Sequence, residues 1–120
     1  MATVKVLTTV GAGEIVDLLD TKTFHGGIGT GGTTAVVGDT ALTTEVETRQ
    51  QSTDTQPSSV QFQAVSSQAI TGTRALDEAG LFDASSGGVM YLSATFDIIN
   101  LENTDTFEAT WQITVQDSSV

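Results

Sequence analysis

The chain has 120 residues, the size of one domain, and contains no cysteine, which excludes a disulfide framework and a thiolate metal site. Fifteen acidic residues against four basic ones give a formal net charge of −11, which repels nucleic-acid phosphates and anionic lipid headgroups. No window approaches the roughly 20 apolar residues of a membrane span, and the first residues lack a signal peptide's charged start and apolar run. We therefore expect one domain over 1–120, made in the cytoplasm, with no nucleic acid and no membrane as a partner.

The acidic residues are dispersed along the chain and do not form an acidic tail. A solvated surface is the simpler interpretation of this charge. A high-salt host is the alternative, because an acidic, lysine-poor surface rich in Thr and Ala suits concentrated salt, where screening removes the self-repulsion.

The N-terminal third predicts a strand, a short helix and a second strand. Residues 3–10, Thr-Val-Lys-Val-Leu-Thr-Thr-Val, are mostly β-branched and predict the first strand, which a Gly-Ala-Gly run ends. Residues 14–20 place apolar side chains at helical offsets, which predicts a helix of one to two turns. A short strand through Phe24 and Ile28 follows, and the glycine-rich segment up to Gly38 predicts a turn or loop.

The middle of the chain predicts short strands separated by turns. In order, we expect a helical turn at 39–45 with Asp39 as its N-cap, a polar edge strand at 46–52, a loop at 53–59 around the only proline, Pro57, a strand at 60–64, and a strand at 69–76 that 79–83 follows before a turn at 84–88.

Two segments near the C-terminus, 89–99 and 107–115, alternate apolar and polar residues, which predicts strands with one dry and one wet face. The loop 100–106 joins them, so we expect an antiparallel hairpin. Seven or eight short strands with frequent turns predict an all-β fold, an antiparallel β-sandwich of jelly-roll type with one short helix near 14–20.

A glycine motif is present without the context that it needs. Gly27, Gly29 and Gly32 match G-x-G-x-x-G, and Glu47 lies twenty residues beyond the first of them, as in dinucleotide-binding folds. That site requires a helix that starts at the last glycine and holds the pyrophosphate. The β-branched residues that follow Gly32 do not predict a helix, so a flexible loop is the better interpretation.

Catalytic signatures are weak as well. His25 is the only histidine, and we expect it in a loop or at a sheet edge. No serine lies in a G-x-S-x-G motif, and Ser85-Ser86-Gly87-Gly88 predicts a turn.

Oxygen-bearing side chains gather in the loop 100–106, and Ca²⁺ accepts ligands of this kind. They are Asn100, Glu102, Asn103 and Asp105, and they lack the EF-hand spacing and its closing glutamate. A solvated loop is the simpler interpretation, since Asn and Asp favour turns for local reasons. Asp77, Glu78 and Asp83 give still less support for a Ca²⁺ site. We therefore expect no catalytic, cofactor-binding or metal-binding residues, and a protein that is not an enzyme.

The aromatic residues predict packing more than binding. Phe107 and Trp111 are expected in the core. Tyr91 lies on the polar face of its strand, where it would be a single exposed aromatic or an interface anchor. A carbohydrate-binding sandwich would need several exposed aromatics, and Tyr91 is the only evident candidate.

The order of three segments resembles a family of small virion structural proteins of tailed bacteriophages and archaeal tailed viruses. The segments are Phe24-His-Gly-Gly-Ile-Gly-Thr-Gly-Gly-Thr-Thr-Ala with Gly38-Asp-Thr-Ala-Leu-Thr-Thr-Glu45 and Thr48-Arg49; Asp77-Glu-Ala-Gly-Leu-Phe-Asp-Ala-Ser-Ser-Gly-Gly88; and Leu92-Ser-Ala-Thr-Phe96 with Trp111-Gln-Ile-Thr-Val115. The resemblance spans residues 24–115, and its most specific part is the run from Glu78 to Gly88.

The resemblance implies a β-sandwich carried on a virus particle, with no catalytic residues. The expected function is capsid decoration or cement, in which the protein binds the major capsid protein or other virion proteins as a homo-oligomer, a trimer or pentamer. The alternative is a tail, baseplate or vertex turret component that acts in host attachment. A virus of a halophilic archaeon would fit the acidic composition.

Overall fold

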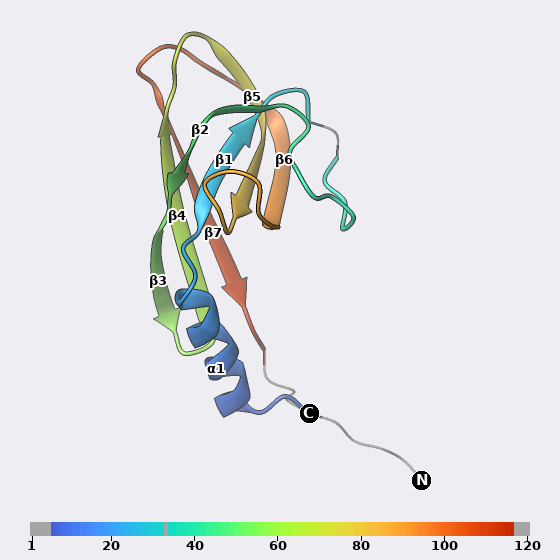
Figure 1. Cartoon of the computed structure of the whole chain (residues 1–120), viewed down its shortest axis with the longest axis vertical. Coiled ribbons are helices and arrows are strands. Elements are labelled where there is room, and N and C mark those ends of the chain that lie inside the picture. Colours follow the sequence, from blue (N-terminus) through green and yellow to red (C-terminus); the bar gives the residue numbers. More distant parts are fainter. Residues whose placement is uncertain (1–5, 33, 117–120) are drawn as a thin grey trace.

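The computed structural model describes residues 6–32 and 34–116, and there it confirms an all-β sandwich with one helix (Figure 1). The elements are α1 (Thr9–Asp20), β1 (His25–Gly29), β2 (Glu45–Gln51), β3 (Thr53–Ser58), β4 (Gln61–Ala69), β5 (Arg74–Phe82), β6 (Met90–Leu101) and β7 (Thr106–Thr114).

The strands form two antiparallel sheets, one with the order β2-β1-β5-β6 and one with the order β3-β4-β7. The pairs β1–β2, β3–β4 and β5–β6 are hairpins within a sheet. The chain changes sheet at Ser52, at 70–73 and at 102–105. On one flank of the sandwich, β2 therefore continues into β3, while β6 and β7 are the edges of the two sheets on the other flank.

The predicted hairpin between 89–99 and 107–115 is wrong, because β6 and β7 belong to different sheets. β6 pairs with β5, and β7 pairs with β4. The two strands face each other across the core, where the rings of Phe96 and Phe107 stack with centroids 5.8 Å apart. Alternation shows that each strand has a dry face, but not whether two such strands pair edge to edge or pack face to face.

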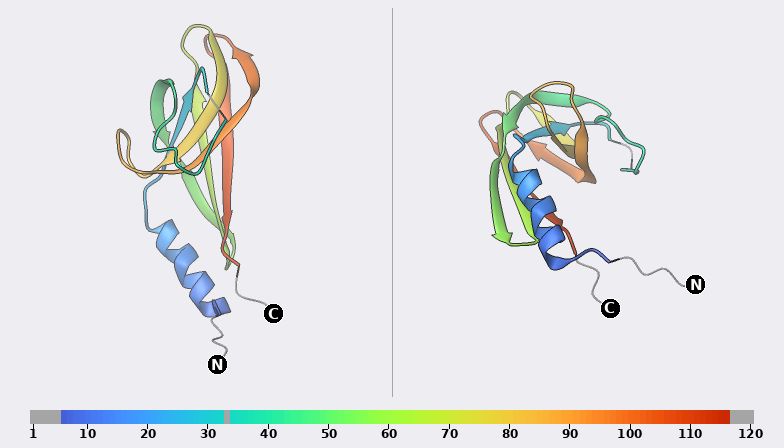
Figure 2. Two further views of the ribbon diagram at one scale, coloured as in Figure 1. Left: turned by 90° about the vertical axis from the view of Figure 1, so that its right-hand side faces the viewer. Right: turned by 60° about the horizontal axis from the view of Figure 1, so that its bottom comes forward.

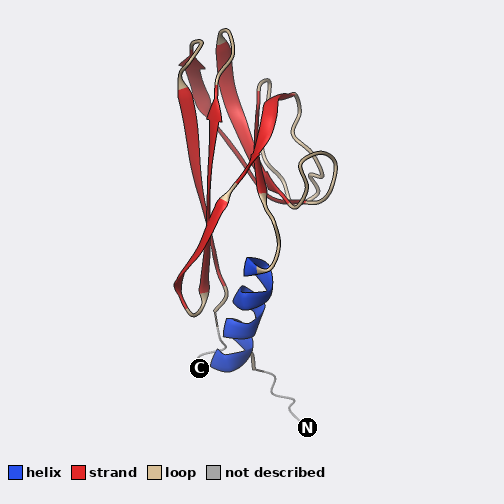
Figure 3. Ribbon diagram, turned by 60° about the vertical axis from the view of Figure 1, so that its left-hand side comes forward, coloured by secondary structure: helices blue, strands red, loops and turns tan. Residues whose placement is uncertain are grey.

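The predicted strand at 3–10 is also wrong where it falls in the described residues, and residues 3–5 lie outside them. Residues 6–8 are not a strand, and α1 begins at Thr9, five residues before the predicted helix. The Thr8 side chain caps the helix by accepting the Gly11 N–H at 3.0 Å. Local β-propensity is overridden because the helix buries Ala12 and Val16 against β3 and β4. Figure 3 shows α1 beside the ends of the long strands, beyond the four-stranded sheet.

Several boundaries in the middle of the chain differ from the prediction. Residues 39–44 form bends and irregular backbone rather than a helical turn, and β2 begins at Glu45 as an edge strand close to the predicted 46–52. The predicted loop 53–59 is largely β3, an edge strand whose register shifts between Thr55 and Ser58, around Pro57. Edges tolerate proline because its missing N–H faces away from the partner. Of the predicted strand at 69–76, Ala69 ends β4, residues 70–73 cross between the sheets, and residues 74–76 continue through the candidate at 79–83 as β5.

The core consists of two clusters that share Trp111. The first lies under α1 and is built from Val16, Phe24, Phe62, Ala64 and Leu81. The second lies between the far halves of the sheets and is built from Ile28, Ile70, Leu76 and Ala79. Trp111 and Phe107 pack against this core as predicted, and both remain half-buried.

The central strand β1 brings the two sheets close together because it is mostly glycine. On its inner side, a Cβ at Gly26 would overlap the side chain of Ser66 on β4. The Gln68 side chain, also on β4 and fully buried, donates a hydrogen bond from Nε2 to the Gly26 carbonyl. The spacing between the sheets at this point therefore depends on the missing side chain.

We expect Gly26→Ala to destabilise the protein by about 1–3 kcal/mol, since the added methyl overpacks a closed core. Combining it with Ser66→Gly removes the overlapping atoms and should recover part of the loss. Urea unfolding of the two single variants and the double variant measures this coupling. Gly38→Ala is the matched control, because a Cβ there meets nothing within 4 Å. Additive losses at 26 and 66 would contradict the proposed overlap.

Candidate interaction surface

Two loops cover the outer face of the four-stranded sheet, the face that points away from β3 and β4 (Figure 2). One is the segment 30–44 between β1 and β2, and the other is the turn 83–89 between β5 and β6. Beneath them the outer-facing residues of β1 and β5 are buried, including Gly27 and the carboxylate residue Glu78, which is 3 % exposed. The outer face is therefore a third packed layer.

Glu78 fixes the end of the 30–44 loop. Its two carboxylate oxygens accept the backbone N–H groups of Thr43 and Thr44 at 3.0 and 2.8 Å. A Cβ at Gly29, the register partner of Glu78, would overlap this carboxylate. A buried charge is tolerated here because backbone donors satisfy it.

Neighbouring residues fix the start and the tip of the same loop. The Gly32 N–H donates to Asp77 Oδ1 at 2.9 Å, and the Ala35 N–H donates to Thr95 Oγ1 at 3.3 Å. At the tip, Asp39 accepts the Val36 N–H at 2.9 Å and donates its own N–H to the Val36 carbonyl at 3.1 Å. This pair closes a tight turn.

Arg49 on β2 holds the 83–89 turn. Its guanidinium forms a bidentate pair with Glu45 at 2.8 and 3.0 Å, and Nη1 donates to the carbonyls of Ala84 and Gly87 at 3.0 and 2.9 Å. It also lies 3.5 Å from the centroid of the Phe82 ring. The planar fork of arginine makes all of these contacts at once, which the ammonium of lysine does not.

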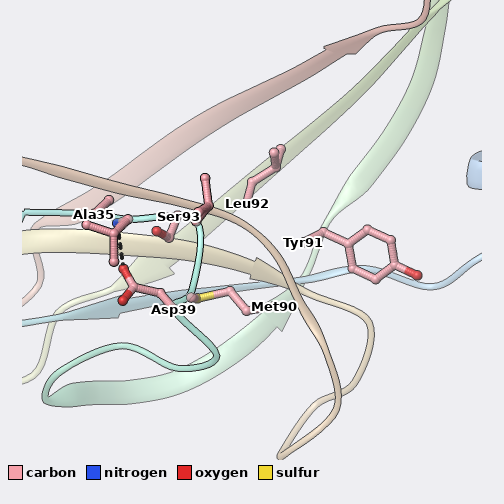
Figure 4. Close-up of a pocket in the computed structure, with 8 residues that line it drawn as sticks. Ala35, Asp39, Met90, Tyr91, Leu92 and Ser93 are labelled. Atoms are coloured by element: carbon pink, nitrogen blue, oxygen red, sulfur yellow. Dashed lines mark hydrogen bonds between the residues drawn. The ribbon is translucent and has the colours of Figure 1, made fainter.

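The two fixed loops expose three apolar side chains, two in the 30–44 loop and one at the end of the 83–89 turn, and we call Val36, Val37 and Val89 the valine patch. Val36 is 61 % exposed, Val89 is 58 % exposed, and Val37 is fully exposed. Beside them is an open hollow of about 370 Å³, lined by Ala35, Val36, Val37, Asp39, Met90, Tyr91, Leu92 and Ser93 (Figure 4). In Figure 4 the Met90 side chain extends toward Asp39, and the Tyr91 ring points away from them.

The Tyr91 ring makes more contacts than the sequence predicts. Its ring meets Phe24 edge-on with centroids 5.1 Å apart, and the Lys22 ammonium lies 6.0 Å from its centroid. A register shift between Leu81 and Phe82 on the partner strand accompanies this placement. Tyr91 therefore closes the core while keeping 37 % of its surface exposed.

The glycines of the G-x-G-x-x-G match serve packing. Gly27 and Gly29 lie within β1, and a Cβ at Gly27 would lie 3.0 Å from the Phe82 ring and 3.1 Å from Glu45 Oε2. Residues 34–44 form turns and irregular backbone instead of the helix that a pyrophosphate site needs. His25, expected in a loop or at an edge, is instead the first residue of this central strand, opposite Gln51 and Phe82.

The oxygen-bearing side chains considered as cation ligands accept hydrogen bonds from backbone N–H groups. Asp105 accepts the Glu102 N–H at 2.8 Å, and Asn103 accepts the Gly72 N–H at 3.2 Å. Asp83 accepts the Val89 N–H at 2.8 Å. Within 6–32 and 34–116, no group of three or more His, Asp or Glu side chains is arranged to hold a metal ion.

Glu47 joins β2 to the crossing between β4 and β5. It accepts the Thr71 N–H and hydroxyl at 3.2 and 2.9 Å and the Arg74 Nε–H at 3.0 Å, with its own backbone at a φ of 65°. Burial raises the pKa of Glu47, but the hydrogen bonds from Thr71 and the charge of Arg74 outweigh burial and leave the pKa below its ordinary value.

Sequence reasoning missed Arg49 and the valine patch. The signals were present: Arg49 is one of only four basic residues, and Val36-Val37 is an apolar pair inside a glycine-rich loop. Neither signal specifies a partner, because Arg49 reaches a turn 35 residues away in the sequence.

Comparison with protein-family models, with curated proteins and with solved structures gives no match. The resemblance to virion proteins accordingly stays a prediction. No helix in the described part of the chain is long and apolar enough to cross a membrane.

We expect Glu78→Gln to release the 30–44 loop. The amide offers one acceptor oxygen in place of two, so one of the Thr43 and Thr44 N–H groups loses its acceptor, at a cost of about 1–3 kcal/mol. Amide hydrogen exchange should accelerate at Thr43 and Thr44 and stay unchanged in β4. Asp97→Asn, a change at an exposed carboxylate, is the control. Unchanged exchange at both threonines would contradict this role.

The lowered pKa of Glu47 makes part of the stability depend on pH. Because the folded pKa lies below the unfolded value of about 4.3, the stabilisation is present above that pH and is lost as the pH falls through the folded pKa. We expect wild type to exceed Glu47→Gln by about 1–3 kcal/mol at neutral pH. The difference should shrink in urea titrations at successively lower pH. A constant difference between neutral and strongly acidic pH would be inconsistent with this linkage.

Proposed function

We propose that the protein is a non-enzymatic structural component of a virus particle that decorates the capsid and binds the shell through the valine patch. The observation that carries the proposal is the patch itself, which consists of three exposed valines on two loops that polar contacts fix in place.

The chemistry of the patch supports a protein partner. The centres of protein interfaces are depleted of charge, and clustered exposed apolar side chains mark contact sites. On a chain with a net charge of −11, Asp39 is the one charged residue among those that line the hollow, and Asp83 lies beside Val89. Asp39 is already engaged by the Val36 N–H. Because the loops are fixed before binding, little conformational entropy is lost on docking.

The identity of the partner comes from the resemblance to small virion proteins, which favours the major capsid protein. A protein that binds only the assembled shell stabilises that shell by mass action. Decoration therefore requires no catalytic residue, only a surface that repeats on each copy around the capsid.

A charge placed in the patch should abolish docking. We expect Val37→Asp to weaken binding to capsids stripped of this protein by at least about tenfold, because an unpaired carboxylate would be buried in the interface. Co-sedimentation with stripped capsids measures binding, and heat resistance of the refilled shell measures cement function. Val10→Asp is the matched control, since Val10 is 76 % exposed and lies on α1, away from the patch.

Equal binding of Val37→Asp and wild type would exclude the patch as the docking site. Imaging of intact virions labelled with an antibody against the chain tests the location. Label over the head is expected, label confined to the tail or to one vertex would favour the attachment alternative, and unlabelled particles would remove the virion assignment.

A further inference from the structure

Three of the four sheet edges carry features that oppose the addition of another strand. β2 has a register shift and three charged side chains, Glu45, Glu47 and Arg49. β3 has a register shift around its proline. β6 shifts register twice against β5 and carries Asp97. Irregularity, charge and proline are the usual means of protecting a sheet edge.

β7 has neither the irregularity nor the proline, and it carries a single charged side chain. It pairs with β4 over nine consecutive residues without a register shift. It contains no proline, no glycine and no basic residue, and Glu108 is its only charged side chain. In the described part of the chain β4 is its only strand partner, so the other side of β7 is a regular, open edge.

The hydrogen-bonding groups of the open edge can be assigned. The Val115 N–H donates to the Val60 carbonyl, and the Asp105 carbonyl accepts from the Ile70 N–H, so odd-numbered residues at both ends of β7 point toward the β4 side. Successive residues of a strand point their N–H and C=O groups in opposite directions. The even-numbered residues of β7 therefore direct theirs outward: Thr106, Glu108, Thr110, Gln112 and Thr114.

The inner face next to this edge is incompletely covered. Phe107, Ala109, Trp111, Ile113 and Val115 are all half-buried, whereas the inner residues Phe62 and Ala64 of β4 are fully buried. A cleft of about 190 Å³, lined by Ala79, Ala94, Phe96, Phe107, Ala109, Thr110 and Trp111, opens between the sheets on this flank. A strand added beside β7 would extend the sheet and cover these side chains.

We propose that β7 pairs with β7 of a second copy, antiparallel about a two-fold axis, to form a continuous six-stranded sheet. An antiparallel pair of identical strands satisfies both open edges with one contact, as a two-fold interface requires. Charge permits a second copy at this edge, because β7 carries only one acidic side chain on a chain of net charge −11. A register centred on Trp111, for example, places Glu108 opposite Thr114 and not opposite another acid.

This pairing does not rest on the proposed function, and its two-fold symmetry differs from the trimer or pentamer that the resemblance implies. It is tested on the purified chain without capsids. We expect sedimentation equilibrium to give twice the mass of one chain, with stronger association as salt screens the remaining repulsion. The amides of Glu108, Thr110, Gln112 and Thr114 should be protected from hydrogen exchange in the dimer.

Thr110→Pro removes one outward N–H without touching a bond to β4, so the monomer fold should persist. We expect the dimer dissociation constant to rise by about a hundredfold or more, since two central bonds are lost by symmetry. Thr110→Val keeps the N–H and is the control that should stay dimeric. If the proline variant fails to fold by circular dichroism, the double variant Thr110→Asp and Gln112→Asp tests the same edge through like-charge repulsion.

A wild-type chain that stays monomeric at high micromolar concentration and in high salt would overturn the proposal. So would a dimer that survives in a folded edge variant, or an assembly that is not two-fold.

Discussion

The close approach of neighbouring layers across β1 is the constraint on which the rest of the structure depends. Gly26 admits the side chains of β4 from inside, and Gly27 and Gly29 admit polar side chains from outside. A side chain at any of these glycines would separate the layers or displace the groups that hold the loops. The close approach produces a packed three-layer structure in a chain of only 120 residues that has few large aromatic residues to build a core.

Buried charged side chains hold the loops of this protein in place. Glu78, Arg49 and Glu47 are nearly inaccessible and are each satisfied by backbone or hydroxyl partners far away in sequence. Such groups add little net stability over apolar packing, but they penalise every arrangement in which their partners are missing. They therefore specify one position for each loop. The proposed contact surface depends on this, because mobile loops carrying the valines would lose conformational entropy on binding.

Repulsion between acidic chains restricts where this protein can make contacts. The apolar tip of the 30–44 loop and the β7 edge are both poor in charge, and they lie on different parts of the molecule. A shell partner at the first site and a second copy at the second site would therefore use different residues. The two sites also differ in their kind of recognition: the loop tip would bind through apolar side chains, and the β7 edge would bind through backbone hydrogen bonds.

By itself the sequence determined the all-β class, the helix after the first strand candidate, the turn at 84–88 and the dry faces of β4, β6 and β7, because these follow from periodicity and local backbone preference. Only the tertiary structure decided that residues 6–10 lead into a helix, that β6 and β7 face each other instead of pairing, and that Glu78 and Arg49 fasten loops. Those outcomes depend on which segments meet in space, and an alternating pattern or a single charged residue carries no information about its distant partner.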